Sequence, residues 1–291
     1  MAFAPRAART TLKVLSVIAS PLAAELGYRL WRNLGRPECV RPHDAEVHSR
    51  AARATLDLAG TRVATYTWGR GPEIVLLVHG WRSRASRFSA VVRELESPNR
   101  TIVAFDAPGN GASSGTFTTV LDYAQIITRL SARHGGFDTI VAHSFGALAA
   151  FLAVREGALA SRLVTVAGVH DVDEILNEFA RLAGLTGRAR AGLRSRIERR
   201  TFPQVDDIWH RFVAELDPAD IRTPLLVVHD RRDPVVDPQQ SELIAEAHNG
   251  PTELMLTEGL GHLRILSDPE VLGQIARFAD GVREPLVADR L

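Results

Sequence analysis

Three side chains that lie far apart in the sequence, Ser144, Asp233 and His262, have the chemical types needed for nucleophilic acyl transfer. A serine hydroxyl is almost fully protonated at neutral pH, so it needs a base within hydrogen-bond reach. A histidine can be this base, and a carboxylate can hold its tautomer and stabilise its cation. We therefore predict that Ser144, Asp233 and His262 are catalytic, although most of the ten histidines are expected to be ordinary surface or core residues.

The segment around Ser144 predicts a sharp turn between a strand and a helix. An apolar, partly β-branched run ends at this serine, and an alanine-rich run typical of a helix follows directly, to Phe151. Ala142 and Gly146 are small, as required where a strand and a helix nearly touch. Such a turn strains the serine backbone and exposes its hydroxyl, whereas the simpler interpretation is a small-residue junction with an idle serine.

Two other glycine-containing segments follow predicted strands. In the first, Gly80 lets the backbone turn so that the amide of Trp81 can point at a developing oxyanion, although a plain glycine turn would look the same. The second, 106–113, contains a proline-glycine turn in which Asp106 is expected to hold backbone amides rather than take part in chemistry.

The acid and the base are also predicted to lie on loops that follow strands. Asp230 and Asp233 stand close together after one strand, and either could orient a histidine. His262 follows the next strand on a loop flanked by glycine, where its ring could reach a neighbouring loop.

Alternating strands and helices predict an α/β fold from residue 54 onward. The predicted strands are 54–58, 62–68, 73–79, 101–105, 139–143, 162–167, 224–229 and 252–256. Besides the helix after Ser144, the predicted helices are 85–96, 118–134, 238–248 and 269–278. This alternation predicts a mostly parallel sheet covered by helices, with reactive groups on loops at the carboxyl ends of the strands.

The alternation stops between residues 170 and 222, where three helical segments, 172–182, 188–200 and 207–216, occur without a strand. A helical insertion leaving the sheet at this edge would cover the active site as a lid. Its middle helix has six arginines, which predict either a solvated face or attraction of an acidic substrate or an anionic lipid surface.

The first 53 residues differ from the rest of the chain. Leucine and isoleucine recur at helical spacing from Leu12 to Leu30, with basic residues around the ends and Pro21 as an expected kink. This pattern favours an amphipathic helix packed on the domain, with a membrane-surface helix, a signal peptide and a transmembrane segment as alternatives. Residues 35–53 are predicted to be a linker.

Composition restricts the class of protein. The 291 residues are 45% hydrophobic and 24% charged, which is typical of one sizeable globular α/β domain. A net charge of +1 argues against a nucleic-acid-binding protein. The single cysteine, Cys39, excludes an internal disulfide and a paired-cysteine metal or redox motif, and favours the cytoplasm, with association to a membrane left open, over a secreted or periplasmic location.

The motifs resemble those of the α/β-hydrolase fold family, from about Leu56 to Phe278. The segments that carry the resemblance are 78–81, 106–113, 142–146, 230–236 and 261–262. The family's chain order of serine, acid and histidine is also the order found here. The main departure is Ala142, where the family most often has glycine, and we expect it to tighten the turn slightly.

This resemblance implies an α/β-hydrolase fold: a mostly parallel sheet flanked by helices, with a helical cap inserted after the strand near 162–167. The implied division is an amino-terminal helix and linker at 1–53, a core at 54–169 and 223–291, and a lid at 170–222. It also implies Ser144 as nucleophile, His262 as base and Asp233 as acid, with an oxyanion hole formed by the amides of Trp81 and Phe145.

The predicted function is hydrolysis of carboxylic esters through an acyl-enzyme on Ser144, without a cofactor or a metal. The expected partner is a small or lipid-like acyl ester. Alternatives are a thioesterase or lysophospholipase acting at a membrane surface, with the amino-terminal helix in peripheral contact, and a catalytically silent binding protein on the same fold.

Overall fold

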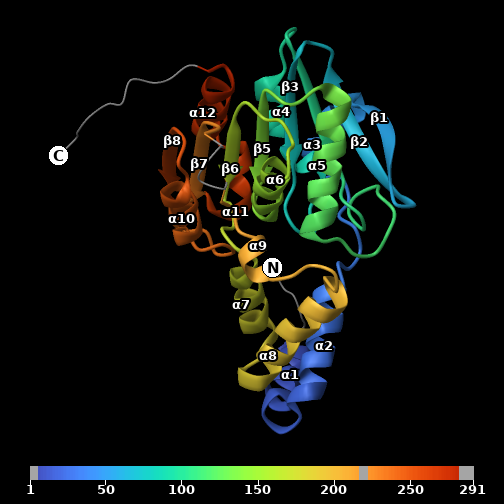
Figure 1. Cartoon of the computed structure of the whole chain (residues 1–291). Coiled ribbons are helices and arrows are strands. Elements are labelled where there is room, and N and C mark those ends of the chain that lie inside the picture. Colours follow the sequence, from blue (N-terminus) through green and yellow to red (C-terminus); the bar gives the residue numbers. More distant parts are fainter. Residues whose placement is uncertain (1–5, 216–221, 282–291) are drawn as a thin grey trace, which may run out of the picture.

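A central sheet organises the fold in the computed structural model, which describes residues 6–215 and 222–281 (Figure 1). The sheet has eight strands in the order β1-β2-β4-β3-β5-β6-β7-β8. β2 pairs antiparallel with β1 and β4, and the remaining pairs are parallel. The strands are β1 (Ala52–Leu58), β2 (Thr61–Gly69), β3 (Glu73–Val78), β4 (Arg100–Phe105), β5 (Thr139–His143), β6 (Leu163–Val166), β7 (Leu225–Asp230) and β8 (Thr252–Thr257). The predicted mostly parallel sheet is thus confirmed.

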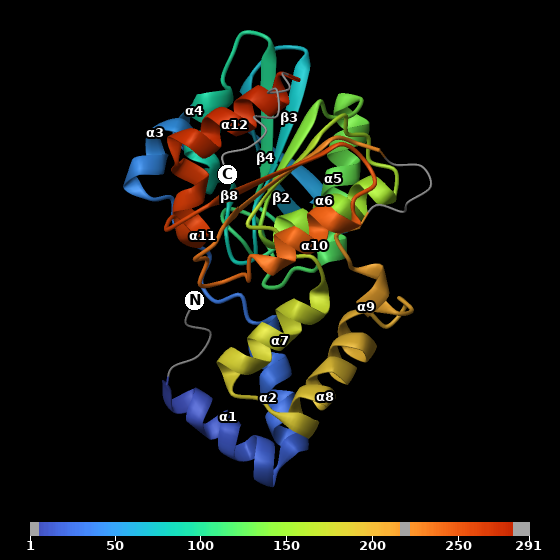
Figure 2. The same cartoon turned by 90° about the vertical axis from the view of Figure 1, so that its left-hand side faces the viewer.

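Helices cover both faces of this sheet (Figure 2). On one face lie α3 (Pro42–Arg50), α4 (Ser89–Leu95) and α12 (Pro269–Ala279), and on the other α5 (Val120–His134), α6 (Phe145–Arg155) and α10 (Gln239–Ala247). Each face has its own buried apolar cluster. β4 and β5 are buried along their whole length, which explains why residues 102–105 and 140–142 are apolar without alternation.

The segment predicted to be a linker, 35–53, instead contains helix α3. Pro42 lies in its first turn, and Asp44 complements the helix dipole there. Val47 is buried, and its carbonyl accepts a hydrogen bond from the indole of Trp68. Proline at a helix start is easily mistaken for a loop signal, which is why composition alone predicted a linker.

The amino-terminal region forms two helices, α1 (Arg6–Ile18) and α2 (Ser20–Arg32), rather than one kinked helix. Pro21 lies in the first turn of α2, where its missing N–H costs nothing, so the chain breaks before it. Within the described part of the chain, none of the helices combines the length and the apolarity that crossing a bilayer requires.

The two amino-terminal helices pack against α7 (Val172–Ala183) and α8 (Gly187–Arg196), and together they form a helical unit below the carboxyl edge of the sheet (Figure 1). The backbones approach closely at two glycines: a Cβ on Gly192 would lie 2.9 Å from Ala24, and one on Gly27 would lie 2.6 Å from Leu185. The sequence predicted the amino-terminal helix and the insertion as two separate parts of the chain.

Several arginines of the insertion have partners inside this helical unit. Arg196 and Arg200 both donate to Glu25 of α2, and Arg194 donates to Asp173 of α7. Part of the basic charge therefore connects the insertion to the amino-terminal helices.

The end of the insertion is less helical than predicted. After α8 comes a π-helical turn, η2 (Ile197–Thr201), and then a single turn, α9 (Ile208–Arg211), in place of the predicted helix 207–216. Helix α9 ends at Arg211 because the next residues bond elsewhere: the carbonyl of Phe212 accepts from the amide of Val172, and the amide of Ala214 donates to the carbonyl of His170. Leu216 and the rest of 216–221 lie outside the described residues, as do 1–5 and 282–291 of the expected amino-terminal and core segments.

Candidate active site

Ser144 occupies the turn between β5 and α6, with φ 56° and ψ −124°. This conformation is rare for a residue with a Cβ, and it indicates a strained turn of the kind found at functional sites. The turn is also sterically tight. A Cβ on Gly146 would lie 2.5 Å from the carbonyl oxygen of Val78, so only glycine fits there.

Ser144, His262 and Asp233 lie together although they are far apart in the sequence. The distance from Ser144 Oγ to His262 Nε2 is 3.1 Å, and His262 Nδ1 lies 2.7 Å from Asp233 Oδ2. Ser144 and His262 are buried, and the Asp233 side chain is fully covered. Because the carboxylate accepts the proton of Nδ1, Nε2 is left as an acceptor that faces the serine hydroxyl.

Asp233 is held as a carboxylate in this position. Its Oδ1 accepts hydrogen bonds from the amides of Val235 and Val236. Burial alone would raise its pKa, but the contacts with His229 and His262 outweigh burial, so the pKa of Asp233 lies well below its usual range. The negative charge is therefore present at any pH at which the histidine could act as a base.

Asp230, the other aspartate on this segment, has a different environment. Oδ1 accepts from the amides of Arg232 and Gly259, and Oδ2 accepts from the amide of Leu260 and the hydroxyl of Thr257. Against the opposing effect of burial, these bonds lower the pKa of Asp230 to about 2. Asp230 thus holds the loop that leads into α11 (Gly261–Arg264), on which His262 lies, without bonding to the histidine ring itself.

Trp81 lies beside Phe145, which directly follows Ser144, and the amides of these two residues are the predicted oxyanion donors. Their rings pack edge to face with centroids 5.1 Å apart. His79 supports the Trp81 segment: its Nδ1 donates to the carbonyl of Gly80 at 2.7 Å, and its Nε2 accepts from the amide of Ala107 at 3.0 Å.

Two supporting contacts were not recognised in the sequence. Tyr123 of α5 donates its hydroxyl to the carbonyl of Gly80, and His143 Nε2 donates to the carbonyl of His262 at 2.9 Å. Burial, followed by the neighbouring His262, lowers the pKa of His143 to about 3, so this ring is neutral. The position of His143 beside the serine was a usable signal, but nothing local indicated Tyr123.

Asp106 has the structural role that its turn predicted. Its carboxylate accepts from the amides of Ala85 and Ala112 and from the hydroxyl of Tyr66, each at 2.8 Å. Asp106 is fully buried, and it joins β2, the segment at Ala85 and its own loop.

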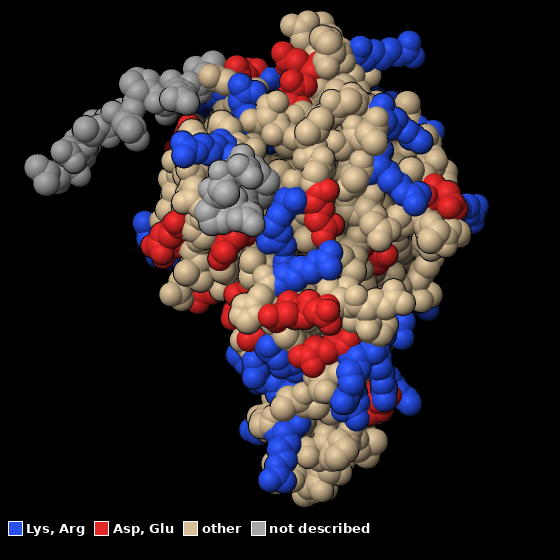
Figure 3. Space-filling model, viewed as in Figure 1, with Lys and Arg blue, Asp and Glu red and all other residues tan. Residues whose placement is uncertain are grey.

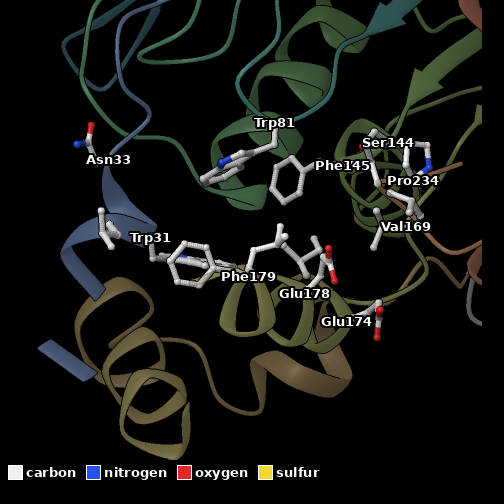
Figure 4. Close-up of a pocket in the computed structure, with 15 residues that line it drawn as sticks. Trp31, Asn33, Trp81, Ser144, Phe145, Val169, Glu174, Glu178, Phe179 and Pro234 are labelled. Atoms are coloured by element: carbon white, nitrogen blue, oxygen red, sulfur yellow. The ribbon is translucent and has the colours of Figure 1, made fainter. Parts of the chain in front are cut away.

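An apolar cavity leads from Ser144 between the sheet and the helical unit (Figure 4). Trp31 of α2 lies against Phe179 of α7 with ring centroids 5.2 Å apart, and Trp81 lies 6.0 Å from Trp31. Its other lining residues include Leu30, Phe145, Val169, Ile175, Leu182, Pro234, Val235 and Val236, with Glu174 and Glu178 as the acidic ones. Both the insertion and the amino-terminal helices therefore contribute walls to this cavity.

A match to a family profile defines the class to which this protein belongs. The profile described as "Alpha/beta hydrolase family" matches residues 75–274, more than half of the chain, so the protein belongs to that family. A sequence search of the curated proteins found no match.

Solved structures of the same fold resemble the chain over most of its length. A membrane phospholipase A, described as a bacterial virulence factor, has 17% identity and a TM-score of 0.61, covering 84% of this chain and 91% of its own. Alpha/beta hydrolase domain-containing protein 10 from mouse also has 17% identity and a TM-score of 0.61, covering 80% and 98%. An esterase from Exiguobacterium antarcticum has 17% identity and a TM-score of 0.57, covering 76% and 96%. At these identities the likeness concerns the fold.

Proposed function

We propose that the protein hydrolyses carboxylic esters by transferring the acyl group to Ser144 and then to water. The observation that carries this proposal is the continuous hydrogen-bonded series from Ser144 Oγ through His262 to Asp233, located beside an apolar cavity. A serine, a base and an oriented acid at these distances form the arrangement that activates a hydroxyl for acyl transfer.

In this mechanism Ser144 Oγ attacks the ester carbonyl while His262 Nε2 takes the hydroxyl proton. The carbonyl oxygen becomes an oxyanion that the amides of Trp81 and Phe145 stabilise. Collapse of the tetrahedral intermediate breaks the bond to the leaving alcohol, which receives the proton from His262. Water then attacks the acyl-enzyme with His262 again as the base, which releases the carboxylic acid and restores the serine.

The apolar cavity supports an acyl chain as its occupant. Its walls are mainly aromatic and aliphatic, and the charged side chains that line it, Glu174 and Glu178, are acidic, so it offers no cation to a negatively charged group. We infer that the insertion acts as a lid, with α7 and the amino-terminal α2 forming the walls that face the acyl chain.

Turnover of p-nitrophenyl esters of graded acyl length, measured beside labelling by a fluorophosphonate probe, tests this function. We expect turnover of esters with apolar chains and modification of Ser144, which peptide mass spectrometry would locate. A matched series of thioesters in the same assay shows whether the protein prefers an ester or a thioester substrate. A folded protein that neither turns over any ester nor labels at Ser144 would instead be the silent binding protein.

A second candidate, an acyl hydrolase that works at a membrane surface, is favoured by an exposed apolar tip on the helical unit. We define the tip as Val14, Val17, Ile18 and Leu22, which are 52%, 80%, 73% and 50% exposed. They are four of the seven most exposed large apolar side chains in the described part of the chain. Exposed apolar groups gathered in this way mark interaction surfaces.

Basic charge beside the tip fits an anionic membrane. Arg9 and Lys13 lie one helical turn apart on α1 and are exposed. On the face seen in Figure 3, basic side chains lie on both sides of the lower lobe, while acidic ones gather at its junction with the sheet domain. Insertion of apolar side chains flanked by cations is how amphipathic helices bind anionic lipid.

Replacing two tip residues, V17D with I18D, should lower binding to phosphatidylserine-containing vesicles by at least about tenfold, because each apolar side chain contributes about 1.5 kcal/mol or more when it is buried. Co-sedimentation at graded lipid concentration measures this. The control is L159D, since Leu159 is 64% exposed but lies outside the tip. If the tip variant binds vesicles as tightly as the wild type, the membrane assignment is wrong. It is also wrong if the wild type self-associates through the tip and the variant does not.

A further inference from the structure

A second cavity shares Ser144 and Trp81 with the apolar cavity, but its other walls are different and mostly polar. His262 lines this polar cavity, whereas the apolar cavity has no contribution from it. In acyl transfer the protonated histidine must reach the leaving atom. The leaving group should therefore occupy the polar cavity when the acyl chain fills the apolar one.

The polar cavity has an excess of positive charge. Its charged lining residues are three arginines, Arg36, Arg82 and Arg87, and one acid, Glu38, apart from His262. Glu38 Oε2 accepts from Nε and Nη2 of Arg87 at 2.9 and 2.5 Å, so one cation is balanced by the acid. The arginines that line this cavity therefore outnumber its acidic side chains by three to one.

Arg87 also has an unused donor. Its side chain is only 9% exposed, and its buried Nη1 has no hydrogen-bond partner among the described residues. Buried charged donors are nearly always paired, so an unpaired one indicates an acceptor supplied by a ligand or by water.

Arg82 lies directly after Trp81 and has φ 53°, a left-handed conformation that residues with a Cβ rarely adopt. Strain of this kind is retained where a side chain or an amide must have a particular position. Here it brings a guanidinium to the wall of the polar cavity beside a predicted oxyanion donor.

We propose that the polar cavity binds a phosphate group carried by the leaving part of the substrate. This inference rests on the proposed acyl transfer to Ser144. Guanidinium groups match phosphate oxygens in geometry and charge, and several arginines around one cavity favour a phosphate over a neutral alcohol. The charged side chains that line the apolar cavity are acidic, so that cavity offers the same anion no cation. Both glycerol phosphate and a phosphate-bearing thiol have this chemistry.

Pairs of substrates that differ only in the phosphate test the proposal. We would compare kcat/KM for 1-butyryl-glycerol 3-phosphate with that for 1-butyryl-glycerol, and for S-butyryl-4′-phosphopantetheine with that for S-butyryl-pantetheine. We expect the phosphate-bearing member of at least one pair to be preferred by about tenfold or more, since a hydrogen bond to a charged group is typically of this strength. The preferred pair identifies the source of the phosphate.

The variants R36Q and R82Q should each lower this preference several-fold, and about tenfold in combination. The control R93Q removes a cation that is exposed, donates to Glu46 and does not line the cavity, so the preference should persist. Calorimetric binding of glycerol 3-phosphate to the intact protein gives a readout independent of turnover, and R36Q with R82Q should weaken it to the same extent.

Hydrolysis of p-nitrophenyl butyrate without a phosphate preference in either pair, and without glycerol 3-phosphate binding, would overturn this inference and leave the proposed function intact. A preference that R36Q with R82Q does not reduce would also overturn it, because the phosphate would then bind elsewhere. Absence of ester turnover together with an unlabelled Ser144 would contradict the proposed function itself.

Discussion

Replacing Ser144 with alanine should lower kcat for ester hydrolysis by at least about 10⁴-fold, because no other group can form the acyl-enzyme. Ser144 Oγ is the hydroxyl 3.1 Å from His262 Nε2, and S144A leaves the histidine and its carboxylate in place. Residual turnover would come from polarisation of the carbonyl and from positioning of water. Stopped assays with p-nitrophenyl butyrate, corrected for background hydrolysis, measure the loss.

The matched control is S267A, because Ser267 is exposed and its hydroxyl only donates to the carbonyl of Arg264. S144A should unfold thermally close to the wild type, since alanine tolerates the strained φ of 56° no worse than serine does. Glycine has no such strain, so S144G should be inactive and equally or more stable. Retained activity in folded S144A would contradict the assignment of the nucleophile.

Replacing Asp233 with asparagine should lower kcat by about 10³- to 10⁴-fold with little change in the fold, because an amide can donate to the histidine and favour the wrong tautomer. In the wild type, the Asp233 carboxylate accepts hydrogen bonds from His262 Nδ1 at 2.7 Å and from two backbone amides. Steady-state assays with p-nitrophenyl butyrate measure this loss of kcat.

Asp230 provides the matched control, because it is the same residue type three positions earlier. D230N should keep most of the activity but lower the free energy of unfolding, since an amide nitrogen would face the N–H groups of Arg232, Gly259 or Leu260. The folded-state pKa of Asp230, about 2, is below its ordinary value of 3.8, so its stabilising effect is present above about pH 4.

This stabilising effect should diminish as the pH falls through 3.8 towards 2, as Asp230 becomes protonated. Urea unfolding of wild type and D230N at several pH values should therefore give curves that converge in acid. If D230N instead lost catalysis while D233N kept it, the catalytic acid would be Asp230.

Periodicity predicted most of the sheet domain because its local signals agree with the final fold. The buried strands β4 and β5 read as continuous apolar runs, and the Thr119 capping box and Gly135 define the ends of α5. The errors fall where local signals are ambiguous. Pro42 opens a helix but resembles a linker residue, and the residues after Arg211 pair with Val172 instead of continuing a helix.

The sequence by itself determined the reactive residue types and the loops on which they lie. Ser144 needed a small residue at position 146 and a strand-turn-helix pattern, and both can be read along the chain because the constraint is local. The two aspartates could not be separated by the same means. Asp230 and Asp233 share one segment, and their roles depend on which backbone amides surround each carboxylate.

Only the tertiary structure decided which distant groups share the site. The parallel sheet brings the ends of β5, β7 and β8 to one edge, so Asp233 and His262 reach Ser144 across about a hundred residues of chain. The same packing places Trp31 of the amino-terminal helices opposite Phe179, and Arg36 in the wall of the polar cavity. These contacts join segments that have no sequence pattern in common, because contact across a folded core depends on topology and shape rather than on local propensity.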